Sequence, residues 1–229
     1  MAAAASGEQP RREGAPLRGD GRRQGPLRVA VLASGSGTNL QAILDRLHGR
    51  GKVEVVGVGS DKPEARALER AAAARVPTAT FPTADFASRG ARDAAIGNWL
   101  ESLRCELVVL AGYMQLLSDA FVRRYRNRIV NVHPALLPAF PGLDAIGQAL
   151  AHGVRVTGVT VHFVDEGVDS GPILLQRPIE LTYTRPVHEV TEEIHAIEHE
   201  LLPRAIELIA DGAVRIDPAN PRLVRIEER

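Results

Sequence analysis

Residues 131–138 place an amide and an imidazole on one short segment that ends in a proline-pinned loop. In an extended chain, residues two apart point to the same side, so Asn131 and His133 should project together while Val132 faces the core. An amide donor beside an imidazole suits a site where negative charge develops on a carbonyl oxygen. The alternative is a satisfied polar pair at the end of a strand.

Residues 162–172 carry three acidic residues, Asp165, Glu166 and Asp169, and two glycines, Gly167 and Gly171, which allow the backbone to turn sharply. A carboxylate there could reach a neighbouring strand, where pairing with a histidine would fix the tautomer of the ring and favour its protonated form. Asp165 and Glu166 make this segment superficially similar to a calcium loop, but the spacing is not that of an EF-hand. With no His-Glu-x-x-His and no cysteine cluster, no metal site is predicted.

Residues 33–39 have the composition of an anion-binding loop. Gly35 and Gly37 would allow a ligand to approach the backbone closely, and a helix beginning near Thr38 would direct N–H groups at a phosphate. The segment matches neither a Walker loop nor the G-x-G-x-x-G fingerprint. The alternative is an ordinary tight turn in which Thr38 or Asn39 caps the helix.

The sequence offers no candidate for a covalent nucleophile. The single cysteine, Cys105, precedes an apolar run and is expected to be a small buried residue, and there is no G-x-S-x-G motif. A site with an asparagine, a histidine and an aspartate but no nucleophile indicates that the acceptor substrate attacks directly. The protein would then stabilise the oxyanion and handle protons.

Apolar runs and helical stripes alternate from residue 27 onward and predict the scaffold of these segments. The expected strands are residues 27–32, 53–58, 78–81, 107–111, 129–133, 157–164 and 173–180. The expected helices are residues 39–47, 65–74, 89–103 and 144–152, with a long final helix around 187–208 in which Pro203 marks a kink or a new first turn. This order predicts an α/β fold, with a mostly parallel twisted sheet, helices on both faces and antiparallel additions in the C-terminal third. Ligands should bind outside the carboxyl ends of the strands.

Composition restricts the class of protein. The formal net charge of +0 argues against a nucleic-acid partner, and no apolar run approaches the roughly 18 residues that span a membrane. One cysteine suits a reducing, cytoplasmic compartment. Residues 1–26 lack apolar periodicity and are expected to be a disordered tail, followed by a single catalytic domain over residues 27–229.

The segments together resemble the folate-dependent glycinamide ribonucleotide formyltransferases of purine synthesis, over about residues 27–212. The motifs that carry the resemblance are Ser34-Gly-Ser-Gly-Thr-Asn-Leu-Gln41, Leu110-Ala-Gly-Tyr-Met114, Asn131-Val-His-Pro-Ala-Leu-Leu-Pro138 and Gly158-Val-Thr-Val-His-Phe-Val-Asp-Glu-Gly-Val-Asp169. Asn-x-His-Pro-x-Leu-Leu-Pro alone is typical of the wider formyltransferase superfamily.

The resemblance implies a Rossmann-like formyltransferase fold and a role for each matching residue. It implies that Asn131, His133 and Asp169 form a catalytic trio and that Gly37, Thr38 and Asn39 bind the substrate phosphate. The folate-binding residues would be Arg89, Met114, Gln115, Leu116, Leu117 and also Asn131. Glu198 would lie on the glycinamide side. Two departures limit the match. Gln115 stands where many relatives carry a basic residue, and residues 144–146 replace histidines of other relatives.

The activity implied is transfer of a formyl group from 10-formyltetrahydrofolate to the glycyl amine of glycinamide ribonucleotide. Asn131 and protonated His133 would stabilise the oxyanion, and Asp169 would assist proton transfer. The partners expected are these two small molecules, with no metal, nucleic acid or membrane, and the chain would be a monomer or a homodimer. The alternatives are a formyltetrahydrofolate hydrolase, a methionyl-tRNA formyltransferase and a non-enzymatic nucleotide-binding module. The first two usually carry extra domains, and the third leaves the trio without a role.

Overall fold

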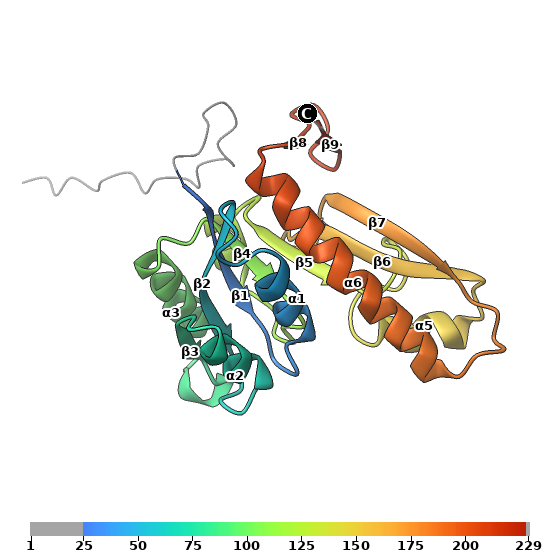
Figure 1. Cartoon of the computed structure of the whole chain (residues 1–229), viewed down its shortest axis with the longest axis horizontal. Coiled ribbons are helices and arrows are strands. Elements are labelled where there is room, and N and C mark those ends of the chain that lie inside the picture. Colours follow the sequence, from blue (N-terminus) through green and yellow to red (C-terminus); the bar gives the residue numbers. More distant parts are fainter. Residues whose placement is uncertain (1–24, 228–229) are drawn as a thin grey trace, which may run out of the picture.

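The structure, a computed structural model, describes residues 25–227, so the tail expected over residues 1–26 lies almost entirely outside the described residues. Seven strands form one sheet, and Figure 1 shows them with the helices around them. The strands of this sheet are β1 (Leu27–Leu32), β2 (Val53–Ser60), β3 (Thr78–Thr80), β4 (Leu107–Leu110), β5 (Ile129–His133), β6 (Val156–Phe163) and β7 (Ile173–Glu180). The α-helices are α1 (Thr38–Arg46), α2 (Arg66–Ala73), α3 (Arg89–Ser102), α4 (Asp119–Arg124), α5 (Ala145–His152) and α6 (Val187–Ala210).

The strand order is β3-β2-β1-β4-β5-β6-β7. β1 to β5 run parallel, whereas β6 is antiparallel to β5 and β7 is antiparallel to β6. The prediction of a mostly parallel sheet with antiparallel additions toward the C-terminus is therefore confirmed. The carboxyl ends of β1, β2 and β4 meet at one edge of the sheet, where the glycine-rich loop and residues 111–118 emerge.

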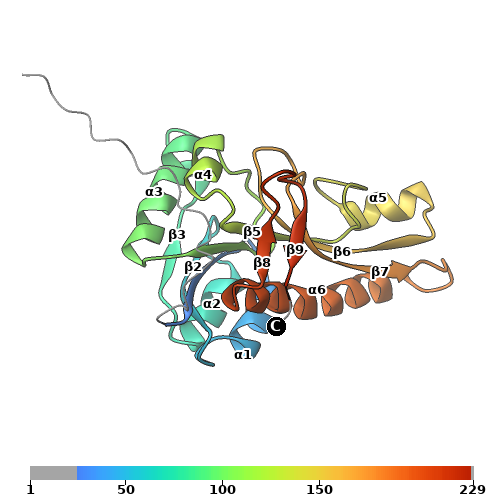
Figure 2. The same ribbon diagram turned by 90° about the horizontal axis from the view of Figure 1, so that it is seen from above.

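Both faces of the sheet are buried because the central strands are apolar along their whole length. Val29 and Val31 of β1 join the cluster that includes α1 and α6, while Ala30 and Leu32 join the cluster that includes α3 and α4. Figure 2 shows α1 and α6 on one side of the sheet and α3 and α4 on the other. This alternation is the period-two pattern of a strand covered on both sides.

Helix α6 crosses the antiparallel end of the sheet as one element of 24 residues. Its apolar stripe, which includes Val190, Ile194 and Leu202, packs on the same cluster as β5 and β6. Pro203 is buried inside this helix, so it does not begin a new one.

Some short elements of the structure were not predicted from the sequence patterns. Helix α4 has only 6 residues, although Ser118 caps it by accepting a hydrogen bond from the N–H of Phe121. A 3-10 turn at Thr83–Asp85 and the hairpin of β8 (Val214–Ile216) and β9 (Val224–Ile226) were also not predicted. Each of these pieces is too short to produce a readable period.

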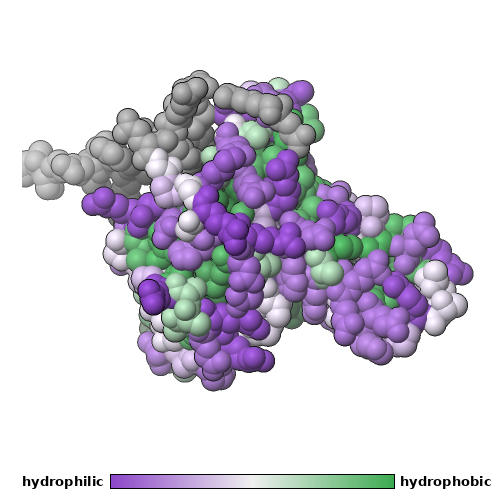
Figure 3. Space-filling view, in the orientation of Figure 1, coloured by the Kyte–Doolittle hydropathy of each residue, from purple (hydrophilic) through white to green (hydrophobic). Residues whose placement is uncertain are grey.

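Among the described residues, no helix is long and apolar enough to cross a membrane. On the face seen in Figure 3, hydrophobic patches are separated by hydrophilic surface.

Candidate functional site

The pairing of β5 with β6 gathers polar side chains on one face of the sheet. Asn131 lies directly opposite His162, and His133 lies opposite Thr160. Directly opposed residues of an antiparallel pair point to the same side, and the intervening Val132 packs in the cluster on the α6 side. Asn131 and His133 therefore project together, away from α6, as their spacing predicted.

The register between β4 and β5 places these side chains at the carboxyl edge of the sheet. Asn131 pairs with Leu110, the last residue of β4, so β5 continues past β4 to His133. The candidate site thus begins where its neighbouring strand ends. This is the position at which α/β sheets bind ligands.

Asp169 joins this group from the loop that follows β6. Its Oδ2 lies 3.3 Å from Nδ1 of His133 and accepts a hydrogen bond of 2.8 Å from the N–H of Gly142. Its Oδ1 accepts from Nδ2 of Asn131 at 3.3 Å and lies 3.5 Å from Nε2 of His162. The three residues predicted as a trio therefore converge, and His162 is a fourth member that sequence reasoning named only as part of a loop.

The surroundings of Asp169 favour its charged form. Burial alone would raise the pKa of this carboxyl, but the hydrogen bonds from His162 and Gly142, together with the proximity of His133, hold the pKa below its ordinary value. Asp169 also has a φ of 50°, a left-handed backbone that is uncommon outside glycine. The carboxylate is therefore a negative charge fixed among the polar groups of β5 and β6.

Thr160 organises the loop that follows His133. Its Oγ accepts from the N–H of Leu137 at 3.0 Å and donates to the carbonyl of Ala135 at 2.7 Å. Further along, the carbonyl of Phe140 lies 2.7 Å from Nε2 of His133. The ring of His133 thus has an oxygen atom within reach of each nitrogen, and it is 4% exposed.

The glycine-rich loop leads from β1 into α1. Gly37 is the N-cap residue of α1, in a left-handed conformation with a φ of 70°, and no side chain caps the helix. The alternative in which Thr38 or Asn39 caps the helix does not hold, because the helix begins at Thr38. A Cβ on Gly37 would lie 2.7 Å from Cα of Ala67, so glycine is required here for packing against α2 as well as for the turn.

Glu198 of α6 meets the start of α1. Nδ2 of Asn39 donates to Oε2 of Glu198 at 2.9 Å, and both side chains are buried. Burial raises the pKa of Glu198, although the hydrogen bond from Asn39 and the charge of His195 oppose this shift. Asn39, predicted to bind the phosphate, and Glu198, predicted on the glycinamide side, are therefore in direct contact.

The predicted folate segment, residues 114–117, follows the strand β4. Met114 and Leu116 are 57% and 62% exposed, whereas Gln115 and Leu117 are half-buried. The N–H of Met114 donates to Oγ of Ser34 at 2.8 Å, which joins this segment to the glycine-rich loop. Arg89 is the exposed first residue of α3.

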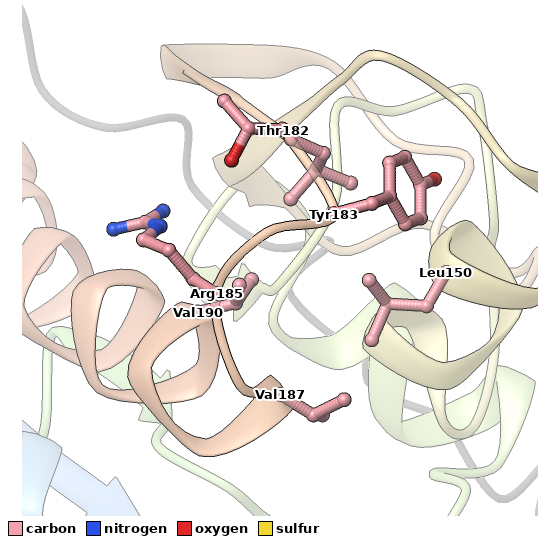
Figure 4. A pocket seen from close by; sticks show the side chains of 7 residues that line it. Leu150, Thr182, Tyr183, Arg185, Val187 and Val190 are labelled. Carbon is pink, nitrogen blue, oxygen red and sulfur yellow. The ribbon is translucent and has the colours of Figure 1, made fainter.

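Cysteine chemistry, metal binding and the cavity beside α6 give no further candidate site among the described residues. Burial raises the pKa of Cys105 to about 12, so its thiol does not ionise near neutral pH. No group of three or more metal-ligating side chains occurs within residues 25–227. A cavity of about 210 Å³ between α5 and α6 is shown in Figure 4, and its lining includes Leu150, Tyr183 and Val190 but no described residue of the predicted sites.

The fold is that of a formyl transferase: the family model with that description matches residues 27–206. Phosphoribosylglycinamide formyltransferase of Bacillus subtilis (strain 168) is 41% identical over 181 residues, which cover 79% of this chain and 93% of that protein. The crystal structure of glycinamide ribonucleotide transformylase 1 from Symbiobacterium toebii has a TM-score of 0.84 and 47% identity, and covers 89% of this chain and 95% of that one.

Longer relatives match as well. The trifunctional purine biosynthetic protein adenosine-3 of Drosophila melanogaster is 43% identical, but this chain, of which 83% is covered, spans only 14% of that protein. Because the bacterial relatives match over nearly their whole length, the chain belongs to the phosphoribosylglycinamide formyltransferase family.

Proposed function

We propose that this protein transfers the formyl group of 10-formyltetrahydrofolate to the glycyl amine of glycinamide ribonucleotide, a step of purine synthesis. The observation that carries the proposal is the convergence of Asn131 and His133 on Asp169, on a chain of this family and at the end of β4. None of the described residues beside them is a candidate nucleophile. The amine of the acceptor would therefore attack the formyl carbon directly. The bond between that carbon and N10 of the folate would then break, and tetrahydrofolate would leave with the proton that the amine loses.

Each member of the trio has a role that follows from its atoms. Nδ2 of Asn131 and a ring N–H of His133 would donate to the formyl oxygen as negative charge develops there. Asp169 holds both donors and would stabilise the positive charge on His133 while a proton leaves the attacking amine. Removing one such donor typically costs about 3–4 kcal/mol in the transition state.

The carbonyl of Phe140 competes with the substrate for His133. Because it lies 2.7 Å from Nε2, a formyl oxygen that uses this nitrogen must take its place. Phe140 itself has a φ of 54°, in a loop that Asp169 ties down through Gly142. We therefore expect the loop over residues 139–143 to shift when substrates bind.

Different elements would bind the two substrates. The ribose phosphate would meet the backbone N–H groups at the start of α1, at Gly37, Thr38 and Asn39, with Glu198 on the glycinamide side. The folate would lie along residues 114–117, together with Arg89 and the side chain of Asn131. The exposed apolar side chains of Met114 and Leu116 suit a flat aromatic ring. When bound, formyl-folate supplies an electrophilic carbonyl carbon.

We expect the protein to act on these small molecules as a monomer or a homodimer, without a metal, a nucleic acid or a membrane as partner. In place of a metal, side chains and the dipole of α1 would neutralise the negative charge of the substrates.

The proposal is tested by incubating the protein with 10-formyltetrahydrofolate, with and without glycinamide ribonucleotide. Loss of formyl-folate that requires the ribonucleotide, with formation of the formylated ribonucleotide, is the expected result. Loss at the same rate without the ribonucleotide would indicate the hydrolase, and no loss in either sample would overturn the proposal.

A further inference from the structure

Two consecutive buried residues of α3 hold the segment that follows β4. Arg92 and Asp93 form an ion pair of 2.8 Å, and their side chains are 2% and 1% exposed. Arg92 also donates to the side chain of Gln115 at 3.1 Å and to the carbonyl of Leu116 at 2.8 Å. Asp93 accepts from the N–H of Ser118 at 2.5 Å. The pair therefore binds both the middle and the end of this segment.

The segment is anchored by polar contacts on its other sides as well. Nε2 of Gln115 donates to Oδ2 of Asp61, which follows β2, at 2.9 Å, and the N–H of Met114 donates to Ser34 after β1. The side chains of Met114 and Leu116 are exposed and contribute little packing. Leu117 packs against the cluster of α3 and α4, and hydrogen bonds hold the other residues of 114–118.

Burying an ion pair to hold a loop costs desolvation free energy. Desolvation of both charges offsets most of their attraction, so such a pair persists when further hydrogen bonds satisfy its remaining donors and acceptors. Here those further bonds go to residues 115, 116 and 118 and not to other parts of α3. The planar guanidinium can serve Asp93, Gln115 and Leu116 at once, which an ammonium group could not do with the same geometry.

We propose that Arg92, held by Asp93, is a positioning residue for formyl-folate, and that it acts through Gln115 and the carbonyl of Leu116. The inference rests on the proposed function, in which residues 114–117 bind the folate. Arg92 does not touch the ligand. It determines where the exposed side chains of Met114 and Leu116 are presented, and thereby the affinity for one substrate only.

The test compares Arg92→Gln with Arg124→Gln. Arg124 also reaches α3, through an exposed ion pair with Glu101, but does not contact the segment. We expect Arg92→Gln to raise the KM for 10-formyltetrahydrofolate at least tenfold and to leave the KM for glycinamide ribonucleotide within twofold. Arg124→Gln should change neither. Equal changes in both KM values for Arg92→Gln, or none, would overturn the inference.

Gln115→Ala keeps the test decisive if Arg92→Gln does not fold, because it leaves the ion pair intact. This variant should raise the KM for the folate at least threefold and lower the melting temperature less than Arg92→Gln does. When both single variants fold, the double variant should be no worse than Arg92→Gln, since both changes interrupt one chain of contacts. An unchanged folate KM in Gln115→Ala, or fully multiplicative effects, would count against the proposal.

Direct binding separates this inference from the proposed function. Equilibrium dialysis with 10-formyltetrahydrofolate alone should show the same loss of affinity in Arg92→Gln and Gln115→Ala. If the wild-type protein binds the folate but transfers no formyl group, the proposed function fails while these affinities still decide the role of Arg92. Wild-type affinity in both variants would remove that role.

Discussion

Asp169 uses both carboxylate oxygens, and each serves a different part of the candidate site. Oδ2 faces His133 and the N–H of Gly142, while Oδ1 faces Asn131 and His162. One side chain therefore fixes the two donors that the proposed reaction needs, and the loop beside them. This explains why a residue on an irregular loop is placed as firmly as those on strands.

Asp169→Asn should lower kcat by about a hundredfold or more, with smaller changes in either KM, because it removes the charge that orients and stabilises His133. Glu166→Gln is the matched control, since Glu166 is an exposed acid of the same loop. Steady-state kinetics with both substrates would measure the effect. Near-normal turnover in folded Asp169→Asn would remove this residue from the mechanism.

The half-buried Asp169 and the buried Glu198 should affect stability with opposite dependence on pH. The pKa of Asp169 is lowered, so its contribution is present above its unfolded pKa and is lost as the pH falls through the folded value. The pKa of Glu198 is raised, so its contribution is full below the unfolded pKa of about 4.5 and is lost as the pH rises through the folded value.

Glu198→Gln should therefore gain stability relative to the wild type as the pH rises from 4 to 7, because glutamine can still accept from Asn39 without a buried charge. Urea unfolding across this range would measure the difference. The same variant should bind glycinamide ribonucleotide more weakly if Glu198 serves the substrate. A stability difference that does not vary with pH would show that Glu198 does not titrate abnormally.

At the scale of elements, Gly37 has a packing role in the turn from β1 into α1 that Gly35 does not share. Gly37 packs against Ala67, whereas no described atom lies within 4 Å of a Cβ placed on Gly35. Gly37→Ala should destabilise the fold by about 1–3 kcal/mol through overpacking and its positive φ. Gly35→Ala should leave the melting temperature unchanged and raise the KM for glycinamide ribonucleotide. Thermal melts and kinetics on the pair would test this, and a rise in the KM for the folate instead would reassign the loop.

The hairpin of β8 and β9 contacts the loop that carries Asp169. Nη2 of Arg222 donates to the carbonyl of Ser170 at 2.9 Å, one residue after Asp169. Arg222→Ala should lower kcat several-fold while both KM values stay near those of the wild type. Arg225→Ala, which loses an ion pair within the hairpin to Asp217, is the control. Equal activity of both variants and the wild type would show that the contact has no catalytic consequence.

The sequence predicted the elements whose apolar pattern is long, such as β1, β5 and α6, because burial imposes a period on them. It also predicted that Asn131, His133 and Asp169 converge. It could not reveal His162, since this depends on the β5–β6 register, or the Arg92–Asp93 pair, which looks like an ordinary charged helix surface. Nor did it reveal that Gly37 packs on α2. These facts arise from tertiary contacts that leave no local signal.

At the scale of the whole molecule, the two parts of the candidate site are formed by residues with very different separations in the sequence. Asn131 and Asp169 are 38 residues apart, whereas Asn39 and Glu198 are 159 residues apart. The first contact joins β5 to the loop that follows β6, and α5 lies between these two strands in the chain. The second joins the first helix to the last one. Because closing a longer loop costs more chain entropy, the second contact is the more dependent on docking of α6.

A chain that leaves the ribosome from its N-terminus exposes Asn39 long before Glu198 has been synthesised. Asn131, His133 and Asp169 also emerge before α6 is complete, but the apolar face of β5 and β6 stays uncovered until this helix packs on it. Both parts of the candidate site therefore need the last long helix. The order of synthesis places the docking of α6 among the late steps in the maturation of this fold.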